Sequence, residues 1–250
     1  MTDKFRDTWS GPTLPECPPV APSYRGVWMR TLLETPDLRD ETTFVRWMQL
    51  GRWHADLRIS AAARAARTAL PLSQCSHEQL ALLATQQGFC GVTQITRGEA
   101  GEVCTWHRLV DYQPPGPNPD AGVMVFGSPD CVIETGVHGL YREIWHRLPH
   151  STGRLIALAE PARPDGLASA RLFMAGQYLM RVRPRRQAGP DFEISFGPIE
   201  SGRWHLQQST LPELEGQSLA FSVHRSETTK AQVQGDLAAM EWDILEWTDA

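Results

Sequence analysis

The chain contains the phrase Tyr24-Arg25-Gly26-Val27-Trp28-Met29-Arg30 and returns to it in Tyr141-Arg142-Glu143-Ile144-Trp145-His146-Arg147. Tyr, Arg, Trp and Arg stand at matching places in the two segments. A repeat whose period is close to half of the 250 residues is typical of two copies of one small domain. We therefore expect two similar domains in tandem.

Two further echoes follow in the same order. The segment 46–58 is similar to the segment 171–183 in the Arg at each end, a central Gly and the aromatic residue after it. The pair Trp106-His107 then returns as Trp204-His205. The spacing between echoes changes, as expected where loops differ in length while strands keep their order.

The echoes divide the chain into three parts. Residues 1–23 are rich in Pro and are expected to form an extended or disordered arm. The first domain is predicted over residues 24–138 and the second over residues 139–250.

Apolar and polar residues alternate in short runs, most clearly in Trp53-His54-Ala55-Asp56-Leu57-Arg58-Ile59. Such alternation is typical of a half-buried strand. Six or seven such runs in each half predict an all-β protein made of two antiparallel β-barrels, because closure removes exposed strand edges. The other predicted strands are 25–34, 42–50, 88–96, 102–112, 122–126, 131–137, 140–147, 154–159, 169–183, 192–199, 203–208, 218–225 and 240–247.

One segment breaks the strand pattern. Ser76-His77-Glu78-Gln79 is a capping box, with Ser76 as the N-cap and Gln79 three residues later. Leu80, Leu83 and Ala84 then form an apolar stripe, and Gly88 is a stop signal. We predict one helix, inserted in the first barrel.

Composition narrows the partners and the compartment. The net charge of −5 and the lack of a long basic run argue against a nucleic-acid partner. No apolar stretch is long enough to predict a membrane span. The five Cys include no C-x-x-C pair, which favours free thiols and a cytoplasmic location.

Six stretches of the first half carry a family resemblance: 24–35, 53–59, 87–93, 104–108, 111–114 and 120–124. They resemble the Hri-like family of fungi and its bacterial relatives. The resemblance covers residues 24–137 well and the second half loosely. It implies a tandem pair of lipocalin-like β-barrels and no particular activity.

The first candidate site is the polar row His54, Asp56 and Arg58. On a strand these side chains share one face, about 7 Å apart. They could supply a general base, its orienting partner and a clamp for an anion or a carbonyl group. In the alternative, Trp53 and the other apolar residues of this strand line the lumen, and the polar row faces solvent or the other barrel.

The second candidate site surrounds His107. Trp106, Arg108 and Tyr112 share a strand face, which could line a ligand site or could be a structural stack of Arg on aromatic rings. His107 is either a ligand or base, or a core residue that the second copy duplicates as His205.

The paired tryptophans favour a structural role. Trp28 and Trp145 are expected to seal the closed end of a barrel, as a Trp near the start of a lipocalin-type barrel does, with Arg30 and Arg147 beside them. A role in stacking on a ligand is the alternative.

Metal and cofactor signatures are absent from the sequence. His146 and His150 would need a helix to converge, but they lie in a predicted strand and beyond Pro149. Haem ligation by a barrel histidine is chemically possible, but no attachment motif accompanies it. We expect no metal and no cofactor, since nucleophile-elbow, phosphate-loop, dinucleotide and zinc-protease motifs are also missing.

Three functions remain open, and a homodimer is compatible with each. The leading hypothesis is a lipocalin-like protein that binds a small apolar or amphipathic molecule in the first barrel. Its expected contacts are Trp53, Arg58, Trp106, Arg108 and Tyr112. The second is a cofactor-independent isomerase, cyclase or lyase with His54, Asp56 and His107 as catalytic residues and Arg58 beside them. The third is a protein-interaction module whose lumens are filled by Trp, Phe and Met.

Overall fold

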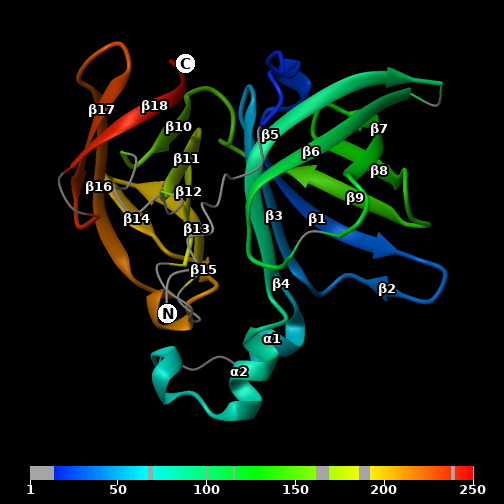
Figure 1. Ribbon diagram of the computed structural model, residues 1–250, viewed down its shortest axis with the longest axis horizontal. Helices are drawn as coiled ribbons and strands as arrows, with labels where there is room; N and C mark the ends of the chain where they lie inside the picture. The colour runs from blue at the N-terminus through cyan, green and yellow to red at the C-terminus, as the bar shows by residue number, and fades with distance from the viewer. Residues whose placement is uncertain are drawn as a thin grey trace, which may run out of the picture.

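The computed structural model describes residues 14–66, 70–99, 101–114, 116–161, 169–185, 192–237 and 240–249. Its strands form two closed antiparallel β-barrels of eight strands each. The barrels lie side by side, and a helical segment extends beyond them from the first (Figure 1). The all-β fold with two tandem barrels and an insertion in the first is confirmed.

The first barrel closes through the pairing of β9 with β1. A short strand, β2 (Arg39–Asp40), extends the hairpin that leaves β1. The barrel strands are β1 (Gly26–Glu34), β3 (Phe44–Gln49), β4 (Trp53–Ile59), β5 (Gln87–Gly98), β6 (Gly101–Asp111), β7 (Asp120–Ser128), β8 (Cys131–Gly136) and β9 (Arg142–Arg147).

The position of β9 corrects the interpretation of the first repeat. Trp28 pairs with Arg147 and Arg30 pairs with Trp145, so the two similar phrases are neighbouring strands of one barrel. They resemble each other because both strands place Trp in the same lumen. The first barrel therefore continues to Arg147, beyond the boundary expected at 138/139.

The second barrel closes through the pairing of β12 with β13. The run expected at 169–183 is a hairpin that turns at Gly176, whose φ of 56° is in the left-handed region. The strands are β10 (Leu155–Ala159), β11 (Arg171–Ala175), β12 (Tyr178–Arg183), β13 (Glu193–Glu200), β14 (Arg203–His205), β16 (Ser218–Arg225), β17 (Lys230–Gly235) and β18 (Met240–Thr248), with β15 (Gln208–Ser209) beside β13. Strand β17 was not predicted from the sequence, because its inner face shows only two apolar residues, Ala231 and Val233.

The other two echoes are equivalent positions of the two barrels. In strand order, β3 and β4 correspond to β11 and β12, and β6 corresponds to β14. A Cβ atom at Gly91 would collide with the carbonyl oxygen of His107, and one at Gly197 would collide with that of His205. The backbone at each Trp-His pair therefore passes so close to the neighbouring strand that only Gly fits there. This close approach gives the echo a structural cause.

Two short helices connect β4 and β5. Ser60 caps α1 (Ala61–Ala65), which the sequence analysis did not predict. The predicted helix is α2 (His77–Leu83), and its capping box between Ser76 and Gln79 is present. The described residues also include three 3₁₀ turns: η1 (Pro22–Tyr24), η2 (Leu72–Gln74) and η3 (Pro212–Leu214).

The end of the N-terminal arm is packed rather than extended into solvent. Cys17, Val20 and Tyr24 are buried, and the Val20 amide donates to the Gly51 carbonyl oxygen at 2.6 Å. Val20 and Tyr24 belong to the core of the first barrel, whose closed end they cover. Of the predicted disordered arm, residues 1–13 lie outside the described residues.

The hydrophobic core has three parts. Aromatic residues such as Trp28, Trp47 and Trp145 fill the lumen of the first barrel. Trp204, Trp242 and aliphatic residues fill the lumen of the second. The third part lies between the barrels, where the outer faces of β1, β3, β4, β5 and β6 pack against those of β10, β11, β12 and β13.

We predict that Leu57→Ala lowers the free energy of unfolding by about 2–5 kcal/mol, because Leu57 is fully buried in the inter-barrel core. Urea unfolding followed by tryptophan fluorescence measures it. Val125→Ala in β7 is the control, since its side chain is 54% exposed, and we expect a change within about 0.5 kcal/mol. Equal losses in the two variants would contradict the assignment of Leu57 to this core.

Candidate functional site

The two faces of β4 have different surroundings, and both are buried. Ala55 and Leu57 pack in the core between the barrels. His54, Asp56 and Arg58 therefore point into the lumen of the first barrel, because neighbouring side chains of a strand alternate. Trp53 packs against the inter-barrel core and lies outside this lumen.

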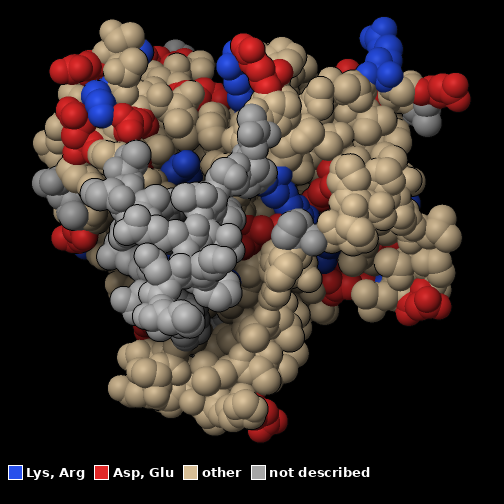
Figure 2. Space-filling model, viewed as in Figure 1, with Lys and Arg blue, Asp and Glu red and all other residues tan. Residues whose placement is uncertain are grey.

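A pocket of about 450 Å³ lies at the end of the first barrel where β4 ends and β5 begins. We call it the mouth pocket. On the face of the first barrel that is visible in Figure 2, acidic and basic side chains lie next to one another. The charged residues that line the mouth pocket are Arg30, Asp40, Arg58, Asp120, Glu134 and Glu143.

Arg58 forms one wall of the mouth pocket. Its Nε donates to Asp56 Oδ1 at 2.7 Å, and Asp56 is only 1% exposed below it. Burial raises the pKa of Asp56, although the Arg58 guanidinium acts in the opposite direction. No described residue accepts a hydrogen bond from the two terminal nitrogens of Arg58, so they remain available to a ligand.

Arg30 of β1 also lines the mouth pocket and binds two carboxylates. Its Nη1 lies 2.6 Å from Glu143 Oε1, and its Nη2 lies 3.1 Å from Asp40 Oδ2. Arg30 and Glu143 are both nearly inaccessible to solvent. This buried ion-pair network leaves Glu143 with a compensated charge.

Glu134 lies directly opposite Glu143 in the pairing of β8 with β9, and the two side chains share a face. The Tyr141 hydroxyl donates to Glu134 Oε1 at 2.7 Å, and Trp145 Nε1 donates to Oε2 at 3.1 Å. Burial, reinforced by the charge of Glu143, raises the pKa of Glu134 well above its usual value. The pocket therefore contains a carboxyl group whose surroundings favour its protonated form over its ionised form.

Neither Glu134 nor Glu143 was predicted from the sequence as a site residue. The available signal is a Glu at an inward position of a predicted strand, two residues after the buried Val132. Glu134 and Glu143 lie opposite each other because of the register of β8 with β9, which no local sequence pattern shows.

His54 lies deeper in the barrel and does not line the mouth pocket. Its Nδ1 is 3.0 Å from Thr93 Oγ1, and Thr93 donates to Gln49 Oε1 at 2.7 Å. Burial lowers the pKa of His54 to about 3, so the ring is neutral at physiological pH. Its Nε2 is buried without a partner among the described residues. The structure thus separates His54 from the accessible groups.

His107 lies at a second pocket, of about 450 Å³, which Trp106, Arg108 and Asp120 also line. His107 Nε2 is 3.0 Å from Gln94 Oε1, and burial lowers the pKa of His107. Arg108 donates to Asp120 at 2.6 Å, and Asp120 also lines the mouth pocket. The Arg108–Asp120 ion pair therefore lies where the two pockets meet.

Arg108 also stacks on an aromatic ring, as the structural alternative expected. Its guanidinium carbon is 3.7 Å from the centroid of Phe89, and its Nη1 donates to Asp111 at 2.8 Å. Both terminal nitrogens of Arg108 are thus engaged within the protein.

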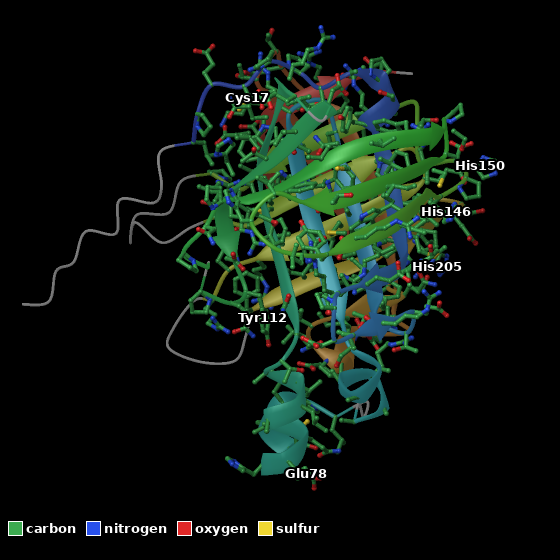
Figure 3. The ribbon with its side chains drawn as sticks, turned by 90° about the vertical axis from the view of Figure 1, so that its right-hand side faces the viewer. Cys17, Glu78, Tyr112, His146, His150 and His205 are labelled. Carbon is green, nitrogen blue, oxygen red and sulfur yellow. The ribbon has the colours of Figure 1, made fainter. Side chains whose placement is uncertain are left out.

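Tyr112 belongs to the inter-barrel core. Its ring meets Phe192 edge to face at 5.3 Å between centroids, and its hydroxyl lies 3.4 Å from the Leu83 carbonyl oxygen at the end of α2. Figure 3 shows Tyr112 next to the helical segment. The five expected ligand contacts are therefore divided among three places. Arg58 lines the mouth pocket, and Trp106 and Arg108 line the second pocket. Trp53 and Tyr112 lie at the inter-barrel core.

The closed end of the first barrel is structural. The Arg147 guanidinium lies 4.9 Å from the centroid of Trp28, and Trp28 Nε1 donates to the Tyr24 carbonyl oxygen at 2.7 Å. Trp47 meets Trp145 at 5.8 Å between ring centroids. The tryptophans fill this end, so free volume in the first barrel lies toward its mouth.

Metal ligands do not converge within the part of the chain that the structure describes: no group of three His, Cys, Asp or Glu is placed to hold an ion. His146 and His150 lie along the right-hand edge of the view, away from Tyr112 (Figure 3). Among the described helices, none has the length and apolar character needed to cross a membrane.

Comparison with known proteins supports the fold. No protein-family model matches the chain, and no curated protein does. Among solved structures, the chain is similar to the crystal structure of the uncharacterized protein YLR301w from Saccharomyces cerevisiae, with a TM-score of 0.58 and 14% identity. The match covers 89% of this chain and 98% of that one. At this identity the similarity shows the shared fold.

We predict that Glu134→Gln changes how stability depends on pH. The folded-state pKa of Glu134 lies above its unfolded value of about 4.3, so the contribution of Glu134 to stability is lost in the wild type as pH rises above about 4, and the variant lacks this loss. The melting temperature of the variant relative to the wild type should therefore increase from about pH 4 to about pH 8. Exposed Glu241→Gln is the control for loss of a carboxyl group, and parallel wild-type and Glu134→Gln profiles would contradict the prediction.

Proposed function

We propose that the first barrel binds a small amphipathic molecule in the mouth pocket. The observation that carries the proposal is an accessible volume of about 450 Å³ with the available nitrogens of Arg58 on one side and the carboxyl group of Glu134 on another. Binding pockets for small molecules commonly measure about 300–1,000 Å³ and contain a few placed polar groups. The mouth pocket meets both criteria.

The charged lining favours an amphipathic ligand over a purely apolar one. An apolar ligand would displace water from Arg58 and Glu134 without replacing the hydrogen bonds, which is unfavourable. Leu33 and Leu38 supply an apolar side to the same pocket. The tryptophans of the closed end leave little room for a long tail in the lumen. A compact ligand with a polar group facing inward fits best.

We also propose membership of the Hri-like family. The stretches that resemble this family fall mainly on β1, β4, β5 and β6 of the first barrel. A tandem-barrel arrangement is what the resemblance implies, and the chain has that arrangement. The proposal adds no activity to the one argued from the mouth pocket.

A cofactor-independent enzyme is the second candidate, and Glu134 is the observation that favours it. A carboxyl group with a raised pKa beside an accessible pocket retains its proton to higher pH, as a general acid requires. His54 and His107 are less suited to share that role, because neither lines the mouth pocket. An enzyme of this kind would use Glu134 with Asp120 or Glu143 rather than the histidines.

Native mass spectrometry of the purified protein, followed by thermal shift with octanoate, octylamine and octyl glucoside, tests the binding proposal. We expect a bound small molecule or a rise in melting temperature with at least one of the three amphiphiles, since a ligand that binds only the folded state stabilises it. If no molecule co-purifies and none of the three raises the melting temperature, the proposal is wrong.

We predict that Gln87→Trp weakens binding of the responding amphiphile at least tenfold, about 1.4 kcal/mol. Gln87 is exposed and lines the mouth pocket, so an indole there narrows the entrance without disturbing the core. Gln177→Trp is the matched control at an exposed position of the second barrel. Titration calorimetry measures both variants, and equal affinities would place the ligand outside the mouth pocket.

A further inference from the structure

Two arginines, Arg30 and Arg58, line the mouth pocket, and a third, Arg108, binds the pocket residue Asp120. Of these three arginines, Arg58 is the one whose terminal nitrogens bind no described residue. Both terminal nitrogens of Arg30 bind carboxylates, those of Glu143 and Asp40. Those of Arg108, beside Asp120, are likewise engaged. Arg58 binds Asp56 through Nε alone, and no described residue binds its Nη1 or Nη2. The ion pair with Asp56 orients a guanidinium fork toward the pocket.

A guanidinium fork matches an anion with two oxygen atoms. Parallel N–H donors bind both oxygens of a carboxylate, which gives the interaction direction as well as strength. Arg58 has one quarter of its side chain exposed to the pocket, so a small anion can reach it. Its environment therefore suits the carboxylate of a ligand.

Glu134, unlike Arg58, is an acidic group that lacks a partner of opposite charge. Its two oxygens accept hydrogen bonds from the neutral Tyr141 hydroxyl and the neutral Trp145 indole, and no described cation forms an ion pair with it. Glu143, directly across the strand pair, has Arg30 as its counter-ion at 2.6 Å. Of the two opposed carboxyl groups, Glu134 is the one whose ionised form lacks a cation. A protonated amine entering the pocket would supply it.

We propose that the ligand of the mouth pocket is a small zwitterion, an amino-carboxylate whose carboxylate binds the Arg58 fork and whose ammonium group lies beside Glu134. This inference rests on the proposed function, since it names the class of the amphipathic ligand. A ligand with only an anion leaves Glu134 without a cation. A ligand with only an amine leaves the Arg58 fork unused.

The apolar part of such a ligand has a place at the rim. Leu33 and Leu38 line the mouth pocket, and Leu38 is 53% exposed. Leu140, next to the pocket residue Tyr141, is 83% exposed. The charged groups therefore point inward and an aliphatic side chain points toward the rim. This orientation predicts an amino-carboxylate with an apolar substituent.

A matched set of small molecules tests the proposal by titration calorimetry. Norleucine and 6-aminohexanoate each contain an ammonium group and a carboxylate, at short and long separation. Hexanoate lacks the amine of norleucine, and pentylamine lacks its carboxylate. We expect at least one zwitterion to bind ten times more tightly than both single-charge analogues.

Two results overturn the proposal. If hexanoate or pentylamine binds as tightly as the better zwitterion, the ligand is not a zwitterion, but the binding function of the mouth pocket stands. If neither zwitterion binds, the proposal also fails, and the amphiphile experiment above then decides separately whether the pocket binds ligands at all.

Two conservative variants assign each charge. Arg58→Lys keeps the cation that Asp56 needs but removes the fork, so it should weaken the zwitterion about tenfold and leave pentylamine unchanged. Glu134→Gln should weaken the zwitterion and pentylamine and leave hexanoate unchanged. Arg183→Lys, at the equivalent strand position of the second barrel, is the control and should change nothing. Equal effects of either pocket variant on all ligands would indicate a structural role and contradict the assignment.

Discussion

Strand β4 is buried on both faces, and this burial governs both the docking of the barrels and the content of the first lumen. Ala55 and Leu57 are covered by the outer surface of the second barrel, so the hydrophobic effect favours docking of the barrels along this strand. Because side chains alternate, the same packing turns His54, Asp56 and Arg58 into the first lumen. Charged groups in a lumen must be paired or hydrogen-bonded, and the ion pairs of the mouth pocket follow from that requirement.

The charged groups in the two lumens are paired in different ways. In the second barrel, Arg181 and Arg183 occupy the strand positions of Asp56 and Arg58, and the fully buried Glu193 binds both arginines. In the first barrel, Arg58 binds its carboxylate through one nitrogen only. The first lumen therefore retains unsatisfied binding capacity where it opens, whereas these charges of the second barrel are satisfied internally. Differences between the barrels, rather than their shared residues, mark the candidate site.

Much of the fold could be predicted because its signals are local. Alternation within β4 and the capping box of α2 each depend on a few neighbouring residues. The similarity of the segments around Tyr24 and Tyr141 was harder to interpret, because two strands of one barrel can resemble each other as two copies of a barrel do. Closure joins β1 to β9 across most of the domain, and no local pattern encodes that pairing.

Local patterns in the sequence were enough to predict most strands, their alternating faces and the helix α2, and the later echoes indicated two similar barrels. The sequence could not determine which face of β4 is inside, because alternation defines two faces without assigning either to the lumen. That assignment follows from the second barrel, which covers the apolar face. The meeting of Glu134 with Glu143 opposite Arg58 was likewise decided by tertiary structure, since strand register and barrel closure bring together residues from β4, β8 and β9.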